Sequence, residues 1–203
     1  MITKLLSGII VEVNCKPVTD SQRNAVEELV KAMYIPDRDL LMQAHYMFSF
    51  SDEVEIEYSC GSCGKRGAFK AFLSDGEVTP AQDDETHERT VDLHNGLRIG
   101  DVLAKQVIIR NPSGIVQEAV LGVTGSSIAM KNELLTRVIK KFVGIDAFPS
   151  RVISELSTKD RNKILKSLEE FSGKVNSVHQ STCASCGTEV SGTLGVEKYF
   201  AGE

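Results

Sequence analysis

Hydrophobic positions in the first fifty residues follow first a strand-like and then a helical spacing. Leu5–Val13 is β-branched and alternates loosely, which predicts a strand. Apolar residues then recur at three- and four-residue spacing, which predicts a helix from Thr19 to about Tyr34. Pro36 is expected to end that helix, and a second short helix is predicted over about 37–48.

A period of two replaces the helical period in the next segment. Val54, Ile56 and Tyr58 alternate with glutamates, which predicts a half-buried strand with an acidic outer face. A returning strand is expected over about 68–73, followed by an exposed acidic loop over 74–88.

The middle of the chain carries a strong hairpin signal. Residues alternate on both sides of Asn95-Gly96, which predicts a tight hairpin within 89–99. A further strand segment is expected at 107–109, and it ends before Pro112.

From Pro112 onward the spacing is mostly helical. The capping-box pair Ser157 and Asp160 marks the start of one predicted helix. An extended run over 174–181 and a last strand from Thr188 to Leu194 are expected after the helices. The helices themselves are predicted over 115–121, 127–143, 152–156 and 158–171.

The composition is that of an ordinary acidic globular protein. The 203 residues are 41% hydrophobic and 25% charged, with a net charge of −5. This charge argues against a protein that coats nucleic acid or binds an anionic membrane. Apolar stretches are too short for a membrane span, and no signal peptide is expected. The expected environment is therefore intracellular, where thiols stay reduced.

Four of the five cysteines form two Cys-x-x-Cys-Gly motifs, each preceded by an extended segment. Two intervening residues place both sulfurs on one side of a tight turn, and the glycine accepts the positive φ that such a turn needs. Two turns facing each other give four thiolates, the usual structural zinc site with no open position for a catalytic water. We therefore predict a structural Zn²⁺ bound by Cys60, Cys63, Cys183 and Cys186.

The spacing between the two motifs sets the predicted architecture. Cys63 and Cys183 are separated by 119 residues, much more than in ordinary zinc ribbons. A shared ion would close a loop containing more than half of the chain. The predicted fold class is α+β, a single intertwined unit over 1–203. Its β and zinc-ribbon part is expected over about 50–110 and 174–200, and its helical part over about 18–48 and 112–172.

Alternative interpretations of the cysteines remain open. The two pairs are alternatively independent redox dithiols, or together they hold an iron–sulfur cluster. A redox motif usually opens a helix, whereas neither pair here precedes a helical pattern. His179, four residues before Cys183, is a candidate to hydrogen-bond a ligand or to replace one. Cys15 is expected to be a buried small hydrophobe.

Three blocks of the sequence, over roughly 37–200, carry a resemblance to a known family. The first block is Asp37–Leu41 leading to Val54–Cys63, and the second is Val91–Leu97 with the strand leading to Pro112. The third block is Leu165–Phe200, which contains a Leu-Glu-Glu-Phe helix, the second cysteine motif and the aromatic pair Tyr199-Phe200. In this order they resemble the T4-type baseplate hub assembly family of contractile-tailed phages. The resemblance implies a tail or baseplate protein, assembled in the host cytoplasm, that acts in assembly or stays in the virion.

The predicted function follows from the cysteines and the resemblance together. We expect a non-enzymatic structural or assembly protein whose partners are other tail or baseplate proteins, with no membrane or nucleic-acid partner. The candidate contact surfaces are the glutamate face of strand 53–58, the acidic loop and Tyr199-Phe200. The alternative is a nucleic-acid-associated zinc-ribbon transcription accessory factor, which needs a basic or aromatic ribbon surface. A thiol oxidoreductase is a third possibility.

Overall fold

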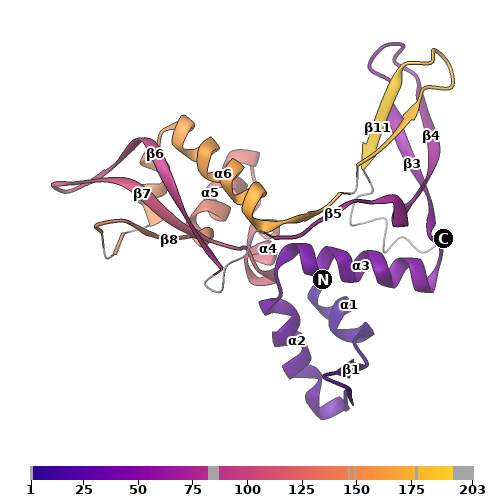
Figure 1. The fold of residues 1–203 in the computed structure, drawn as a ribbon, viewed down its shortest axis with the longest axis horizontal. Coiled ribbons are helices and arrows are strands. Elements are labelled where there is room, and N and C mark those ends of the chain that lie inside the picture. Colours follow the sequence, from indigo (N-terminus) through magenta and orange to yellow (C-terminus); the bar gives the residue numbers. More distant parts are fainter. Residues whose placement is uncertain (1, 82–86, 146, 149, 177, 194–203) are drawn as a thin grey trace. The chain divides into compact units, whose positions relative to one another are not determined.

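The computed structural model describes residues 2–81, 87–145, 147–148, 150–176 and 178–193, and its fold class is α+β as predicted (Figure 1). The chain forms two compact units, each built from two separate stretches. Unit 1 contains Met1–Arg38 and Pro80–Lys174, and unit 2 contains Asp39–Thr79 and Val175–Glu203. Among the described residues, no helix is both long enough and apolar enough to cross a membrane.

Unit 1 combines helices with a three-stranded antiparallel sheet of order β6-β7-β8. Helix α3 (Ile35–Ser49) starts in this unit and continues into unit 2. The other elements of unit 1 are α1 (Ile2–Ile9), β1 (Glu12–Val13), β2 (Lys16–Pro17), η1 (Asp20–Gln22), α2 (Arg23–Ala32), β6 (Glu88–Ile99), β7 (Val102–Arg110), α4 (Gly114–Leu121), α5 (Ser127–Val138), β8 (Ile139–Phe142), η3 (Ser150–Glu155) and α6 (Thr158–Ser172).

Unit 2 consists mainly of two antiparallel hairpins. One is β3–β4 and the other is β10–β11, and each holds one of the cysteine motifs between its strands. The elements of this unit are β3 (Glu53–Ser59), β4 (Arg66–Phe72), η2 (Leu73–Asp75), β5 (Val78–Thr79), β10 (Val178–Thr182) and β11 (Glu189–Thr193), and β9 (Lys174–Val175) lies where the chain returns to it.

The main hydrophobic core lies in unit 1, between the sheet and its helices. Strand β6 alternates, so that Val91, Leu93 and Leu97 are buried, and α6 packs against this strand (Figure 1). The core also takes residues from β7, α5, β8 and α6: Val107, Ile109, Leu135, Val138, Ile139, Phe142, Ile164 and Leu168.

The start of α6 is held to β6 by a buried carboxylate. Asp160 is fully buried, and its backbone N–H donates to the Ser157 hydroxyl at 3.1 Å, which confirms the predicted cap of this helix. The Asp160 carboxylate also accepts hydrogen bonds from the backbone N–H groups of His94 and Asn95. The Ser157 side chain therefore caps the helix, while the Asp160 side chain fixes the conformation of the strand that α6 packs against.

The prediction of a tight hairpin turn at Asn95-Gly96 is wrong. Strand β6 runs through both residues, and the chain reverses at Gly100-Asp101 instead. Gly96 does take a positive φ of 78°, but within an irregularity where the pairing with β7 shifts register. The Asp160 carboxylate binds backbone N–H groups of the strand here. The Asn-Gly pair, whose glycine takes a positive φ, therefore forms a bulge within β6 and not a turn.

Replacing Gly96 with alanine is expected to destabilise unit 1. A Cβ at this position would lie 2.6 Å from the carbonyl oxygen of Ala104, and the positive φ disfavours any side chain. The left-handed conformation alone costs about 1–2 kcal/mol, and the close contact adds to it. Chemical denaturation of Gly96→Ala beside Gly100→Ala, where a Cβ meets nothing within 4 Å, measures this difference. Equal losses in the two variants would contradict the close-approach argument.

Several other predicted elements differ from those observed. The predicted strand Leu5–Val13 is mostly helix α1, which buries Thr3 and Leu6, and only the short β1 is extended. The predicted helix from Thr19 to Tyr34 is the short η1 followed by α2. Pro36 lies inside the first turn of α3, where the missing N–H costs nothing, instead of ending a helix.

The predicted helix over 127–143 ends early, and Cys15 is not buried. Helix α5 stops at Val138, and β8 follows because pairing with β7 lets Ile139 and Phe142 enter the core. Cys15 is exposed in the short β1–β2 turn with a φ of 58°, so it is not the core residue that was expected.

The hairpin β6–β7 also falls outside the expected grouping. The sequence groups this hairpin with the β and zinc-ribbon part over about 50–110, whereas in the structure it lies in unit 1, where it packs against α6 and shares a core with α5. Its inward face is lined by large aliphatic residues that need helices to cover them. That the two units behave as one intertwined folding unit remains a prediction.

Arg38 is a fully buried charge within the helical part of unit 1. It donates through Nη1 to the Val30 carbonyl at 2.9 Å and through Nη2 to the Thr3 hydroxyl at 3.0 Å. Its Nη2 lies 3.7 Å from a carboxylate oxygen of Glu118. A Cβ on Gly114 would come within 1.6 Å of Arg38 Nη1, so α4 can begin here only with glycine. Arg38 thus ties α1, α2 and α4 together.

Candidate metal centre

Each cysteine motif forms the turn between two paired strands. In the first hairpin Ser59 pairs with Arg66, and the turn begins directly at Cys60. In the second hairpin Thr182 pairs with Glu189, and the turn begins at Cys183. The strand β3 alternates as predicted, with Val54, Ile56 and Tyr58 buried and the glutamates exposed. Strand β11 packs against β3, which brings the two hairpins side by side (Figure 1).

The two turns share one backbone hydrogen-bond pattern. In the first, the Cys60 N–H donates to the Lys65 carbonyl and the Gly64 N–H donates to the Cys60 carbonyl, both at 2.9 Å. In the second, Cys183 and Gly187 make the corresponding bonds, both at 2.8 Å. The glycines have φ values of 71° and 72°, as the sequence motif requires. The turns are therefore two copies of one local structure.

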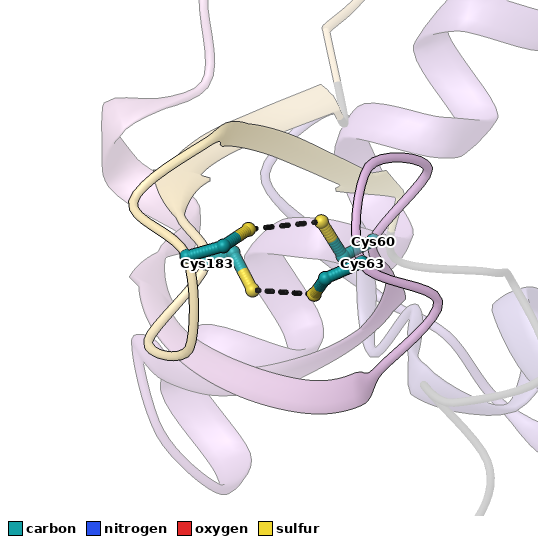
Figure 2. A group of neighbouring side chains, drawn as sticks. Cys60, Cys63 and Cys183 are labelled. Carbon is teal, nitrogen blue, oxygen red and sulfur yellow. Dashed lines mark hydrogen bonds between the residues drawn. The ribbon is translucent and has the colours of Figure 1, made fainter.

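The four cysteine sulfurs converge between the two turns (Figure 2). The Sγ atoms of Cys60 and Cys186 are 3.6 Å apart, and those of Cys63 and Cys183 are 3.8 Å apart. All four sulfurs lie within 4.8 Å of one another, so together they can hold a metal ion. Sulfurs at the corners of a tetrahedron around a zinc ion are about 3.8 Å apart, given a Zn–S bond of about 2.3 Å. The Cys60–Cys186 and Cys63–Cys183 separations match that geometry.

The surroundings of the second turn favour its thiolates. The backbone N–H of Ser185 donates to the Cys183 sulfur, as do the Cys186 N–H and the Tyr58 hydroxyl. Together these bonds outweigh the effect of burial and lower the pKa of Cys183 to about 6. The pKa of Cys186 is also lowered, mainly by the Thr188 hydroxyl. At Cys63 a hydrogen bond from the Lys65 N–H lowers the pKa, but partial desolvation of the sulfur and the neighbouring thiols outweigh it and raise the value to about 12. Four crowded thiols need a cation to ionise together.

Tyr58 connects the first hairpin to the second turn, a role that sequence reasoning missed. Its hydroxyl oxygen accepts a hydrogen bond from the Ala184 N–H at 3.3 Å. Its ring packs with the buried Cys60, Cys183 and Val190 under the sulfur cluster, while Cys63 and Cys186 are exposed. The alternation identified Tyr58 as an inward residue of β3, but no local signal pointed to its distant partner.

The two hairpins approach closely at Gly192, and a side chain there is expected to separate them. A Cβ on Gly192 would lie 2.4 Å from Cγ2 of Ile56 and 3.2 Å from the Glu57 carbonyl. We expect Gly192→Val to weaken metal retention, because β11 can no longer lie against β3. Competition with a chromophoric chelator measures retention, with exposed Ser191→Val as the matched control. Equal retention by both variants would contradict this expectation.

Two alternatives from the sequence, His179 as a metal ligand and the cysteine pairs as redox dithiols, can be compared with this geometry. His179 lies on β10, paired with Gly192, and the metal-binding group found among the described residues consists of the four cysteines without it. Each Cys-x-x-Cys turn joins two strands, whereas a redox motif usually opens a helix.

Comparison with known proteins identifies a family. No curated protein and no solved structure matches the chain significantly. The profile of the family described as T4 bacteriophage base plate protein matches residues 10–190, a span that contains both cysteine turns and most of both units. The chain therefore belongs to the T4 bacteriophage base plate protein family.

Proposed function

We propose that this baseplate protein is a hub component or hub assembly factor of a contractile phage tail, and that a structural Zn²⁺ joins its two cysteine turns. The observation that carries the proposal is the convergence of four sulfurs from segments 119 residues apart in a chain of the baseplate family. The protein acts by binding other tail and baseplate proteins in the virion, and it has no catalytic role.

The geometry supports a single zinc ion over the other ligands of four thiolates. Four cysteines complete a tetrahedral coordination shell and leave no position for a reacting water. An iron–sulfur cluster inserts several irons and sulfides between its cysteines, which spreads the cysteines on different irons farther apart than the 4.8 Å within which all four sulfurs lie here. The metal therefore serves stability and shape.

The metal would fix a surface for partner proteins. With β11 held against β3, the outward glutamates of β3 form a rigid stripe beside the two turns, and Glu53 is partly neutralised by Lys70 at 2.6 Å. This acidic stripe favours protein partners, since a nucleic-acid backbone would be repelled by it. Tyr199-Phe200, the other expected contact, lies outside the described residues.

Complementation of a phage that lacks this gene tests the proposal. Plasmids would supply the wild-type chain, Cys183→Ser, or Cys15→Ser as the control at an exposed cysteine away from the cluster. We expect complete tails with the wild type and Cys15→Ser, and particles without finished baseplates with Cys183→Ser. Normal tails with Cys183→Ser would refute the structural role of the metal, and normal tails without the gene would refute the role in assembly.

Cross-linking within assembled particles or assembly intermediates tests the placement at the hub. We expect cross-links from this chain to hub proteins. Cross-links confined to peripheral baseplate proteins would contradict that placement while leaving membership of the baseplate intact.

A further inference from the structure

A cationic cleft lies between α6 and β6 in unit 1, outside the cysteine site. It has a volume of about 390 Å³. Three cationic side chains line it: Arg89 from β6, and Lys163 and Lys166 from α6. The hydroxyl residues Thr90 and Ser167 also line the cleft. The packing of α6 on β6 sets the two walls in place, as Figure 1 shows for these elements.

Arg89 is the least compensated charge of this cleft. It sits on the same face of β6 as the buried Val91 and is itself half-buried. Its Nη1 atom is buried and has no hydrogen-bond partner among the described residues, and no carboxylate of those residues forms an ion pair with it. Because Arg89 also lines the cleft, an anion bound there would lie beside a guanidinium that no described carboxylate neutralises, and a charge-assisted contact is stronger than a neutral one.

The two acidic residues of the cleft are already engaged. Asp92 accepts a hydrogen bond from the Gln106 side chain at 2.8 Å. Glu170 lies 3.9 Å from Lys166 on the exposed side of α6. Arg89 and Lys163 are thus left to attract an anion, and the carboxylates at the rim limit how much negative charge can enter.

We propose that this cleft receives a single carboxylate side chain, Asp or Glu, from a protein partner. A guanidinium matches a carboxylate in a planar, two-bond geometry. Asp92 and Glu170 would repel a polyanion such as nucleic acid, whereas one carboxylate fits between them and Arg89. The inference rests on the proposed binding of other baseplate proteins, and it specifies the chemistry of one contact.

Nuclear magnetic resonance titration of the ¹⁵N-labelled full chain tests the proposal. The probe is N-acetyl-glutamate N-methylamide, with its glutamine counterpart as the neutral control, and inorganic phosphate and a short single-stranded DNA as separate arms. We expect saturable shifts of the Arg89 Nε–H and of the Thr90 and Ser167 amides with the glutamate probe. Arg89→Gln should weaken binding about tenfold, with Arg98→Gln, exposed on the same strand, as its control.

Lys163→Gln is a second variant, which leaves the half-buried Arg89 unchanged. Its control is Lys159→Gln, since Lys159 is also exposed on α6. It should weaken the glutamate probe several-fold. Equal shifts with the glutamine probe, unchanged binding in Arg89→Gln and Lys163→Gln, or saturation only by phosphate or DNA would overturn the proposal. Because the isolated chain is tested with a small molecule, such a failure leaves the proposed role in the baseplate standing.

Discussion

Cys183→Ser is expected to release the metal and to loosen the two hairpins of unit 2 while unit 1 stays folded. The hairpins are short, and the core beneath their sulfurs is a cluster of Tyr58, Cys60, Cys183 and Val190. Sheets of two strands are marginally stable without further support. Binding of a structural metal is coupled to folding in such sites. Unit 1 has its own, much larger core, so we expect it to stay folded without the cluster.

Hydrogen exchange read by mass spectrometry separates these two effects. Peptides from 53–72 and 178–193 should lose protection in Cys183→Ser, and peptides from β6, β7 and α6 should keep it. Cys15→Ser is the matched control, because that thiol is exposed and lies outside the sulfur cluster. Unchanged protection of both hairpins in Cys183→Ser, with full metal content, would refute the shared four-sulfur site. Loss of protection throughout the chain would support one intertwined folding unit.

Arg38→Met is expected to lower the free energy of unfolding by about 1–3 kcal/mol, the usual cost of leaving buried polar groups without their hydrogen-bond partner. The substitution leaves the Val30 carbonyl and the Thr3 hydroxyl without their donor. It also removes the cation that lies 3.7 Å from the Glu118 carboxylate. Burial raises the pKa of Glu118, but the Thr3 hydroxyl and Arg38 outweigh it and hold this pKa below its usual range.

Urea denaturation of the full chain measures this loss through the signal of unit 1. Lys31→Met is the control, since Lys31 is a cation on α2 whose ion pairs with Glu27 and Glu28 are at the surface. We expect that control to leave the midpoint almost unchanged, because exposed ion pairs add little. An Arg38→Met midpoint as close to the wild type as that of Lys31→Met would contradict the structural role of the buried guanidinium.

The features predicted well from the sequence are those decided locally. The cysteine turns need two residues between the thiols and a glycine with positive φ, and both requirements are visible in Cys60–Gly64 and Cys183–Gly187. The alternation of β3 and the cap of α6 at Ser157 likewise depend only on nearby residues.

The features that were missed are decided by distant residues. The Asn95-Gly96 signal became a bulge because Asp160, 65 residues from Asn95, binds the strand there. The last turn of the predicted helix 127–143 became β8 because β7 offers it a partner. The burial of Arg38 needs Thr3, Gly114 and Glu118 around it, and no spacing rule connects those positions.

X-ray absorption spectroscopy of the purified full chain, combined with metal quantification, tests most directly that one zinc ion joins the two distant cysteine turns. We expect one zinc per chain with four sulfur neighbours at about 2.3 Å. Cys60→Ser and Cys183→Ser, one from each turn, should each remove the four-sulfur signal. Absence of zinc from a chain purified without chelators would contradict the shared zinc site. A four-sulfur zinc signal that survives in Cys60→Ser or in Cys183→Ser would contradict it as well.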